Sequence, residues 1–375
     1  EAVVYSLYLV FATMAPIFLL EALLGWLRVE NRPGTWVIGT LLRLGTTILG
    51  VVLFVAVFRL RVVGVQYAAL AAALVPAAVL GVYCLLKIRA SFDARLFLRM
   101  TRFAIPLGLS GIAIFIIHFG DRFILRRYVT FADLGLYGLA YKIGMLVSAL
   151  YASFHTYWSA QVYQVMRRDD ATEIFARLFT YMTLAISFCG LSIVVCSKPA
   201  LKLLVAPAYH EAAPIIPLLV AAYCIRSVGD FVRCLFLVEG RPGYDAISTW
   251  IASAVCLAAY FVMIPSFGVW GAAAATAITF LVFTGISIIW TYRIRPYRVE
   301  ASRLAKVGVA LAAVSIPYAA LPVTSLPAQI AWATLLITAF PGLLWLMRFP
   351  TVGERAAIAG VANFVFRLRH LSPWR

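Results

Sequence analysis

The feature that most constrains this chain is the recurrence of long apolar stretches. A helix needs about 20 mainly apolar residues to cross a bilayer. Eleven stretches meet this need, and short loops separate them. They are Ala2–Leu27, Trp36–Phe58, Val62–Leu86, Phe103–Phe119, Leu134–Trp158, Phe175–Cys196, Ala213–Leu237, Ala246–Ile264, Val269–Trp290, Leu304–Leu321 and Ala328–Met347. The sequence therefore predicts an all-α polytopic membrane protein with about 11 transmembrane helices.

The composition excludes a soluble domain. Hydrophobic residues make up 64% of the chain and charged residues only 13%, whereas a soluble domain carries about 25% charged residues. The net charge of +17 is typical of nucleic-acid binders. Here, however, the positive residues lie in short loops between apolar stretches, so we expect no nucleic-acid partner.

The loop charges predict the orientation. Alternate loops together with the span ends beside them, counted from the loop after the first span and including the tail, hold 21 Lys and Arg residues, against 7 in the remaining loops. Because cytoplasmic loops carry the excess of Lys and Arg, we expect a cytoplasmic C-terminus and an extracytoplasmic start. An extracytoplasmic start without a signal sequence would be explained if further spans precede residue 1.

Ionisable residues inside predicted spans are costly and are functional candidates by default. Arg226, Asp230 and Arg233 follow one another at the spacing i, i+4, i+7, which places them on one helix face. Arg226 and Asp230 can pair, which would leave Arg233 as an excess positive charge. Two interpretations remain, namely an ion-pair network between helices and a wet, cationic cavity for an anionic substrate. We favour the cavity.

Other ionisable residues fit the same cavity. Arg43 and Lys142 lie within predicted spans, and neither has an acidic residue one turn away. Arg43 could instead reach the inner interface, and Lys142 could pair with Glu21 or Asp121 of another span. Asp121 and Arg122 directly follow a predicted span and could form a helix cap or a gating ion pair at the outer mouth.

The sequence contains no metal-ligand spacing, nucleotide-binding loop or nucleophile motif. We therefore expect no metal, no cofactor and no enzymatic activity. In the tail, Thr351 and Glu354 have capping-box spacing and precede apolar residues at helical intervals. This pattern predicts an amphipathic cytoplasmic helix on the membrane surface, with partner docking as the alternative.

Four segments, in order, resemble one family of membrane transporters. They are Ile105–Leu107 continuing through Gly120–Leu125, Leu134–Lys142, Tyr209–Leu219, and Ile264–Thr276. Together they are similar to the Wzx-type oligosaccharide (O-antigen) flippases of the multidrug/oligosaccharidyl-lipid/polysaccharide superfamily. The resemblance covers most of Glu21–Arg295.

This resemblance implies a two-lobed bundle whose first lobe is incomplete here, with about three spans missing at the start. Residues 1–90 would be the last three helices of the N-terminal lobe. Residues 97–292 would be the six-helix C-terminal lobe, 303–348 an additional helix pair, and 349–375 the cytoplasmic tail.

The family also implies a function. The protein would move an undecaprenyl-pyrophosphate-linked oligosaccharide of O-antigen, capsule or exopolysaccharide across the bacterial cytoplasmic membrane by alternating access. Membrane lipids, a polysaccharide polymerase and a chain-length regulator are the other partners it suggests. Arg43, Lys142, Arg226 and Arg233 would bind the anionic headgroup, Asp230 would orient the arginines, and Glu21 or Asp230 would couple transport to an ion.

Three alternatives remain. A cation-coupled multidrug exporter of the same superfamily would need an acidic cavity, whereas the predicted spans hold more basic than acidic residues. A membrane-embedded polysaccharide polymerase or ligase would need a large outer loop with acid and base groups, and the outer loops here are short. A structural scaffold would gain nothing from the charged face at Arg226–Arg233.

Overall fold

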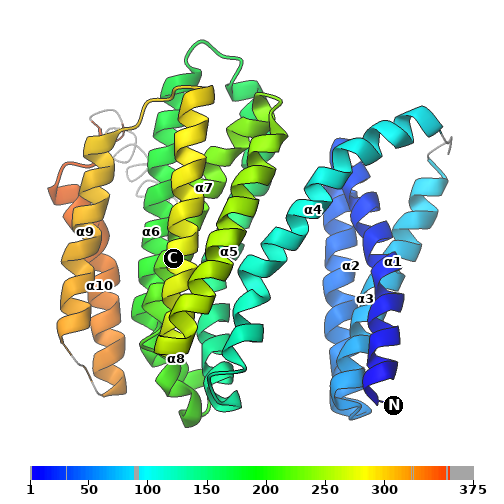
Figure 1. The fold of residues 1–375 in the computed structure, drawn as a ribbon, viewed down its shortest axis with the longest axis horizontal. Coiled ribbons are helices and arrows are strands. Elements are labelled where there is room, and N and C mark those ends of the chain that lie inside the picture. Colours follow the sequence, from blue (N-terminus) through cyan, green and yellow to red (C-terminus); the bar gives the residue numbers. More distant parts are fainter. Residues whose placement is uncertain are drawn as a thin grey trace, which may run out of the picture. The chain divides into compact units, whose positions relative to one another are not determined.

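The computed structural model describes residues 2–30, 32–87, 93–321, 323, 325–351 and 354, and every regular element within these ranges is helical (Figure 1). The elements are α1 (Ala2–Val29), α2 (Pro33–Val51), the π-helical turn η1 (Val52–Val57), α3 (Arg61–Leu85), α4 (Ala94–Leu125), α5 (Phe131–Val165), α6 (Ala171–Leu204), the 3₁₀ helix η2 (Pro207–Ala212), α7 (Ile216–Val238), α8 (Pro242–Ile294), α9 (Ala301–Ala320) and α10 (Leu326–Leu346).

The helices have the length and apolarity of membrane spans. In the described part of the chain, nine helical stretches are long and apolar enough to cross a bilayer. Helix α7 is not among them because it carries three charged residues, and α8 is counted once although a kink divides it. Each of the eleven predicted spans therefore has its helix. The predicted fold class, an all-α polytopic membrane protein, is confirmed.

Large apolar side chains cover the outside of these helices. Phe18 is 71% exposed and Val262 is 72% exposed, whereas Leu20 and Ile264, two residues away from each, are fully buried. So much exposed apolar surface would be unfavourable in water. Lipid is the solvent that suits it.

The chain divides into two units, Glu1–Arg99 and Met100–Arg375. In the first unit, α3 packs against both α1 and α2. Leu20, Leu24, Leu27, Ala77 and Leu80 form its apolar core. The division falls close to the predicted boundary between 90 and 97, but the assignment of the segments to two lobes stays a prediction.

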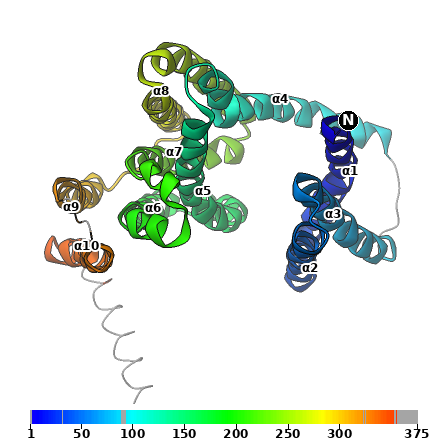
Figure 2. The same ribbon diagram turned by 90° about the horizontal axis from the view of Figure 1, so that it is seen from below.

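The second unit is built around α7, which packs against α5, α6 and α8. Helices α9 and α10 pack against each other and against α6 (Figure 2). Aromatic rings fill much of the interior, and Trp158, Phe175 and Phe231 pack in one cluster in which Trp158 and Phe231 are stacked. This packing fixes α7, and with it the charged face predicted from the sequence.

A kink at Gly268 divides α8 into two helices, 242–267 and 269–294. Gly268 has φ 53° and ψ −126°, a backbone conformation that residues with a Cβ atom rarely adopt. This break lies where the sequence separates the spans Ala246–Ile264 and Val269–Trp290.

The start of the tail has the predicted capping box. The Thr351 N–H donates to Glu354 Oε2 at 2.8 Å, and the Glu354 N–H donates to Thr351 Oγ1 at 3.4 Å. Glu354 Oε2 also accepts from Arg303 Nη2 at 2.9 Å, which ties the capping box to α9. The predicted amphipathic helix beyond Glu354 lies outside the described residues.

Candidate functional site

The charged face of α7 points into the second unit. Arg226 Nε lies 3.3 Å from Asp230 Oδ2, and Arg233 Nη1 lies 3.2 Å from Asp230 Oδ1. The helical spacing of four and three residues brings each arginine to the same carboxylate. Asp230 therefore contacts both guanidinium groups, and its role in orienting them stays a prediction.

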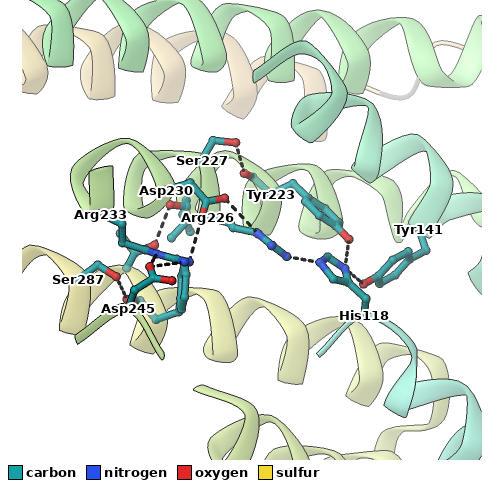
Figure 3. Close-up of polar contacts among 12 residues, drawn as sticks. His118, Tyr141, Tyr223, Arg226, Ser227, Asp230, Arg233, Asp245 and Ser287 are labelled. Carbon is teal, nitrogen blue, oxygen red and sulfur yellow. Dashed lines mark hydrogen bonds and ion pairs between the residues drawn. The ribbon is translucent and has the colours of Figure 1, made fainter. Parts of the chain in front are cut away.

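Asp245, in the first turn of α8, completes the charged group. Its Oδ1 accepts from Arg233 Nε at 2.5 Å and also contacts Nη2 (Figure 3). The expectation that Arg233 is left as an unpaired positive charge is therefore wrong. Arg226, Asp230, Arg233 and Asp245 carry two positive and two negative charges.

His118 of α4 contacts the other end of this group. Arg226 Nη1 donates to His118 Nε2, while His118 Nδ1 lies 3.1 Å from the Tyr141 hydroxyl and 3.2 Å from the Tyr223 hydroxyl (Figure 3). The ring also stacks on Tyr223, with an interplanar angle of 15°. Three helices, α4, α5 and α7, thus converge on one imidazole.

Two phenylalanine rings of α8 support the arginines. The guanidinium carbon of Arg226 lies 5.1 Å from the centre of the Phe280 ring, and that of Arg233 lies 4.6 Å from the Phe283 ring. A ring face attracts a cation without accepting a directed hydrogen bond. The rings therefore hold the guanidinium planes while leaving N–H donors for oxygen partners.

A cavity of about 430 Å³ opens beside these groups. It is lined by His118, Met145, Ser148, Tyr151, Ala152, His155, Arg226, Asp230, Arg233, Cys234, Leu237 and Asp245. The four charged side chains are 17–24% exposed, so they are reached from the cavity but are mostly enclosed. A volume of this size holds a small polar headgroup.

Lys142 lies apart from this charged group. It is exposed on α5, three residues before Met145, a residue of the cavity wall. Within the described residues of the second unit Lys142 forms no ion pair, so Asp121, which pairs with Arg122, is not its partner. Pairing of Lys142 with Glu21 of the first unit stays a prediction.

Glu21 and Arg43 lie in the first unit and pair with each other. Arg43 Nη1 lies 2.8 Å from Glu21 Oε1, and the two side chains are 39% and 51% exposed. The sequence assigned Arg43 to substrate binding and Glu21 to ion coupling, and these roles stay predictions. The ion pair means that a change to either residue alters the other.

Asp121 and Arg122 do form an ion pair, at 3.3 Å. They do not follow a helix, however, because α4 continues to Leu125. Asp121 is fully buried and accepts a hydrogen bond from the Tyr137 hydroxyl at 2.6 Å. The helix-cap interpretation is thus wrong. The gating role stays a prediction, and it would have to be carried out by a buried carboxylate.

Sequence reasoning missed Asp245 and His118 as members of the site. Asp245 stands just before a predicted span and reads as a loop residue. His118 lies inside a predicted span, where an ionisable side chain is already a signal of function. That signal could have found His118, but its pairing with Arg226, 108 residues away, depends on the tertiary fold.

Comparisons with known proteins agree with this architecture. Residues 3–158 match the family model described as "Polysaccharide biosynthesis protein". Among solved structures, "Lipid II flippase MurJ, inward closed conformation" is similar with a TM-score of 0.65 at 12% identity, over 92% of this chain and 73% of that chain. A search of curated proteins gives no significant match. The predicted resemblance to polysaccharide-transporter flippases is confirmed.

Proposed function

From this likeness to the polysaccharide-transporter flippases, we propose that the protein moves an undecaprenyl-pyrophosphate-linked oligosaccharide across the bacterial cytoplasmic membrane by alternating access. The observation that carries the proposal is the pair Arg226 and Arg233, which line a cavity inside an apolar helical unit. Enclosing charged groups in an apolar unit costs free energy. Binding of a multiply charged anionic headgroup would offset that cost.

The arginines bind the pyrophosphate by exchanging partners. Asp230 and Asp245 hold the two guanidinium groups in place while the cavity is empty. Arginine presents its N–H donors as a planar fork that suits phosphate as well as carboxylate. Phosphate oxygens thus replace carboxylate oxygens, and the site is neutral until substrate arrives.

Exchange of partners also suggests how an ion is coupled to transport. When the pyrophosphate takes Arg226 and Arg233, Asp230 loses its counter-charges and gains affinity for a cation or a proton. In this proposal Asp230 is the residue of the second unit that couples binding of an ion to transport. Glu21, with Arg43 beside it, is the corresponding candidate in the first unit, and Lys142 adds a positive charge near the cavity.

Asp121 and Arg122 would act in gating. They lie on α4 next to His118, and Arg122 Nη1 donates to the His118 carbonyl oxygen at 2.7 Å. Because this contact joins two residues one turn apart on α4, a movement of this end of α4 during alternating access would move Asp121, Arg122 and His118 together.

Complementation tests the proposal. The gene product that contains this chain is expressed in a flippase-null strain that accumulates lipid-linked oligosaccharide. We expect the unchanged protein to restore surface polysaccharide, and Arg226→Ala/Arg233→Ala to reduce it about tenfold or more. Arg168→Ala is the matched control because Arg168 makes an exposed ion pair with Asp170. Equal restoration by all three proteins, at equal membrane levels, would contradict the proposal.

One observation favours a second candidate, a cation-coupled multidrug exporter. Asp230 and Asp245 both line the cavity, so a cationic drug would find two carboxylates there. Efflux of a cationic dye that is lost in Asp230→Asn/Asp245→Asn, together with failed complementation, would select this function.

A further inference from the structure

The His118 ring must be neutral in this arrangement. Its Nε2 faces an N–H of Arg226, and arginine has donors but no acceptor. Nε2 therefore presents a lone pair, and the ring proton sits on Nδ1. There it faces the Tyr141 and Tyr223 hydroxyl oxygens at 3.1 and 3.2 Å, and either of them can accept it.

Charged and titratable groups surround the ring on every packed helix. Asp121 and Arg122 are on its own helix, Tyr141 is on α5, and Tyr223, Arg226 and Asp230 are on α7. Helix α8 contributes the Phe280 ring, 6.4 Å away, and Tyr151, His155, Arg233 and Asp245 share the cavity. A second proton would thus meet Arg226 directly, with Asp230 behind it.

We infer that His118 is a positioning residue that aims Arg226 into the cavity, and that it does so only as the neutral Nδ1–H tautomer. The inference rests on the proposed function, in which Arg226 binds the anionic headgroup. Asp230 holds Arg226 through Nε and His118 holds it through Nη1. The guanidinium plane is therefore fixed at both ends, with the remaining N–H donors available to a ligand.

The contact also sets a condition on Arg226. A proton on Nε2 would replace the acceptor with a donor and turn the contact into repulsion between two cations. Arg226 can keep this position only while the ring is neutral.

Binding of undecaprenyl pyrophosphate to the full gene product in lipid nanodiscs tests the inference. We compare the unchanged protein with Arg226→Ala, His118→Phe, His118→Gln and the double variant His118→Phe/Arg226→Ala. Phenylalanine keeps a ring of similar size but has no acceptor. Glutamine keeps a neutral acceptor for Arg226 and a donor for the tyrosines.

We expect His118→Phe to raise the Kd about tenfold, as for a lost hydrogen bond to a charged group. His118→Gln should remain within about threefold of the unchanged protein. The double variant should bind no more weakly than Arg226→Ala alone, because His118 acts through Arg226. Size-exclusion profiles and melting temperatures establish that each variant is folded, and His118→Gln keeps the test open if His118→Phe does not fold.

The possible failures are distinguishable. If Arg226→Ala binds like the unchanged protein, the proposed function fails. If Arg226→Ala weakens binding but His118→Phe does not, or if the two effects add fully, only the positioning role fails. A loss in His118→Gln as large as that in His118→Phe would also overturn this role.

The tautomer has its own spectroscopic signature. In ¹⁵N-histidine-labelled protein, the His118 signals are identified by their absence from His118→Gln. At neutral pH we expect a protonated Nδ1 and an unprotonated Nε2. A protonated Nε2 would overturn the inference.

Discussion

The Arg233 guanidinium contacts two carboxylates, and the proposed function has a phosphate displace them. Asp230 contacts it from α7 and Asp245 from α8. If substrate binds by displacing them, weakening one carboxylate must favour the anion. The affinity for the headgroup then depends on how strongly these carboxylates compete with it for the arginines, and not on an excess of positive charge.

This exchange predicts the effect of Asp245→Asn. The substitution leaves two guanidinium groups to share one carboxylate, so the cavity gains a net positive charge. We expect undecaprenyl pyrophosphate to bind about threefold or more tightly, measured as a Kd in nanodiscs. Asp170→Asn, which removes an exposed acid of the same type, should leave the Kd unchanged. Weaker binding in Asp245→Asn would show that Asp245 positions Arg233 instead of competing for it.

Part of this site follows from the sequence. The spacing of Arg226, Asp230 and Arg233 on one helix is local, and their shared face was predictable. The contacts of Arg226 with His118 and of Arg233 with Asp245 join separate helices. They depend on how α4 and α8 pack against α7, which no spacing in the sequence reports.

At the scale of the element, the kink in α8 depends on one residue. A Cβ atom at Gly268 would force an unfavourable backbone and would lie 3.4 Å from Val129 Cγ1. We expect Gly268→Ala to destabilise the protein by about 1–3 kcal/mol, measured as a lower melting temperature in detergent. Gly285→Ala is the matched control in the same helix because nothing lies within 4 Å of its added Cβ. Equal melting temperatures would argue against the strained turn.

The contact between α9 and the start of the tail, which we call the joint, joins Arg303 to the Glu354 carboxylate. Burial opposes ionisation of the Glu354 carboxyl, but hydrogen bonds from Tyr181 and Thr351 and the charge of Arg303 outweigh it and lower its pKa. Since the folded-state pKa is lowered, this stabilisation is present above the ordinary value of 4.5 and is lost as the pH falls through the lowered value.

Proteolysis measures this joint. We expect trypsin to cut after Arg355 several-fold faster in Glu354→Gln than in the unchanged protein at pH 8, because the contact with Arg303 weakens. Glu173→Gln, a change of the same type on α6, should have no effect. For the pH dependence, the acid-active protease pepsin replaces trypsin, and the advantage of the unchanged protein should shrink below pH 4.5. An equal rate in both proteins at pH 8 would contradict the joint.

Hydropathy predicts where helices cross the membrane but not where they end. Helix α5 continues beyond the predicted span Leu134–Trp158 to Val165, and α4 begins before Phe103 and ends after Phe119. Polar residues continue these helices because their backbone hydrogen bonds remain satisfied outside the apolar stretch. This is why Asp121 was predicted at a helix end and is found inside α4.

For the whole molecule, the loop charges predict an orientation that the fold does not determine. In a background without native cysteines, Glu211→Cys lies in an expected outer loop and Asp169→Cys in an expected cytoplasmic loop. We expect a membrane-impermeant maleimide to label Glu211→Cys on intact cells and Asp169→Cys only after permeabilisation. The reverse pattern would invert the orientation, and with it the direction of transport proposed above.

The helices and the all-α membrane fold were predictable because both depend on the length of the apolar stretches. The assignment of the segments to two lobes depends on the family resemblance and stays a prediction, although the chain does divide near residue 99. The roles of Glu21 and Arg43 were not predictable in the same way. Their positions in the sequence predict charged groups within spans, whereas a role in binding or coupling depends on how the first unit meets the substrate.

The central claim is tested most directly by flipping in proteoliposomes that contain the purified gene product. A fluorescent undecaprenyl pyrophosphate carrying one N-acetylhexosamine is placed in both leaflets, and a membrane-impermeant quencher reports what reaches the outside. The account predicts rapid exchange with the unchanged protein and with Arg168→Ala, and exchange slowed about tenfold or more in Arg226→Ala/Arg233→Ala. Equally fast exchange in the double variant, at equal protein content, would contradict it.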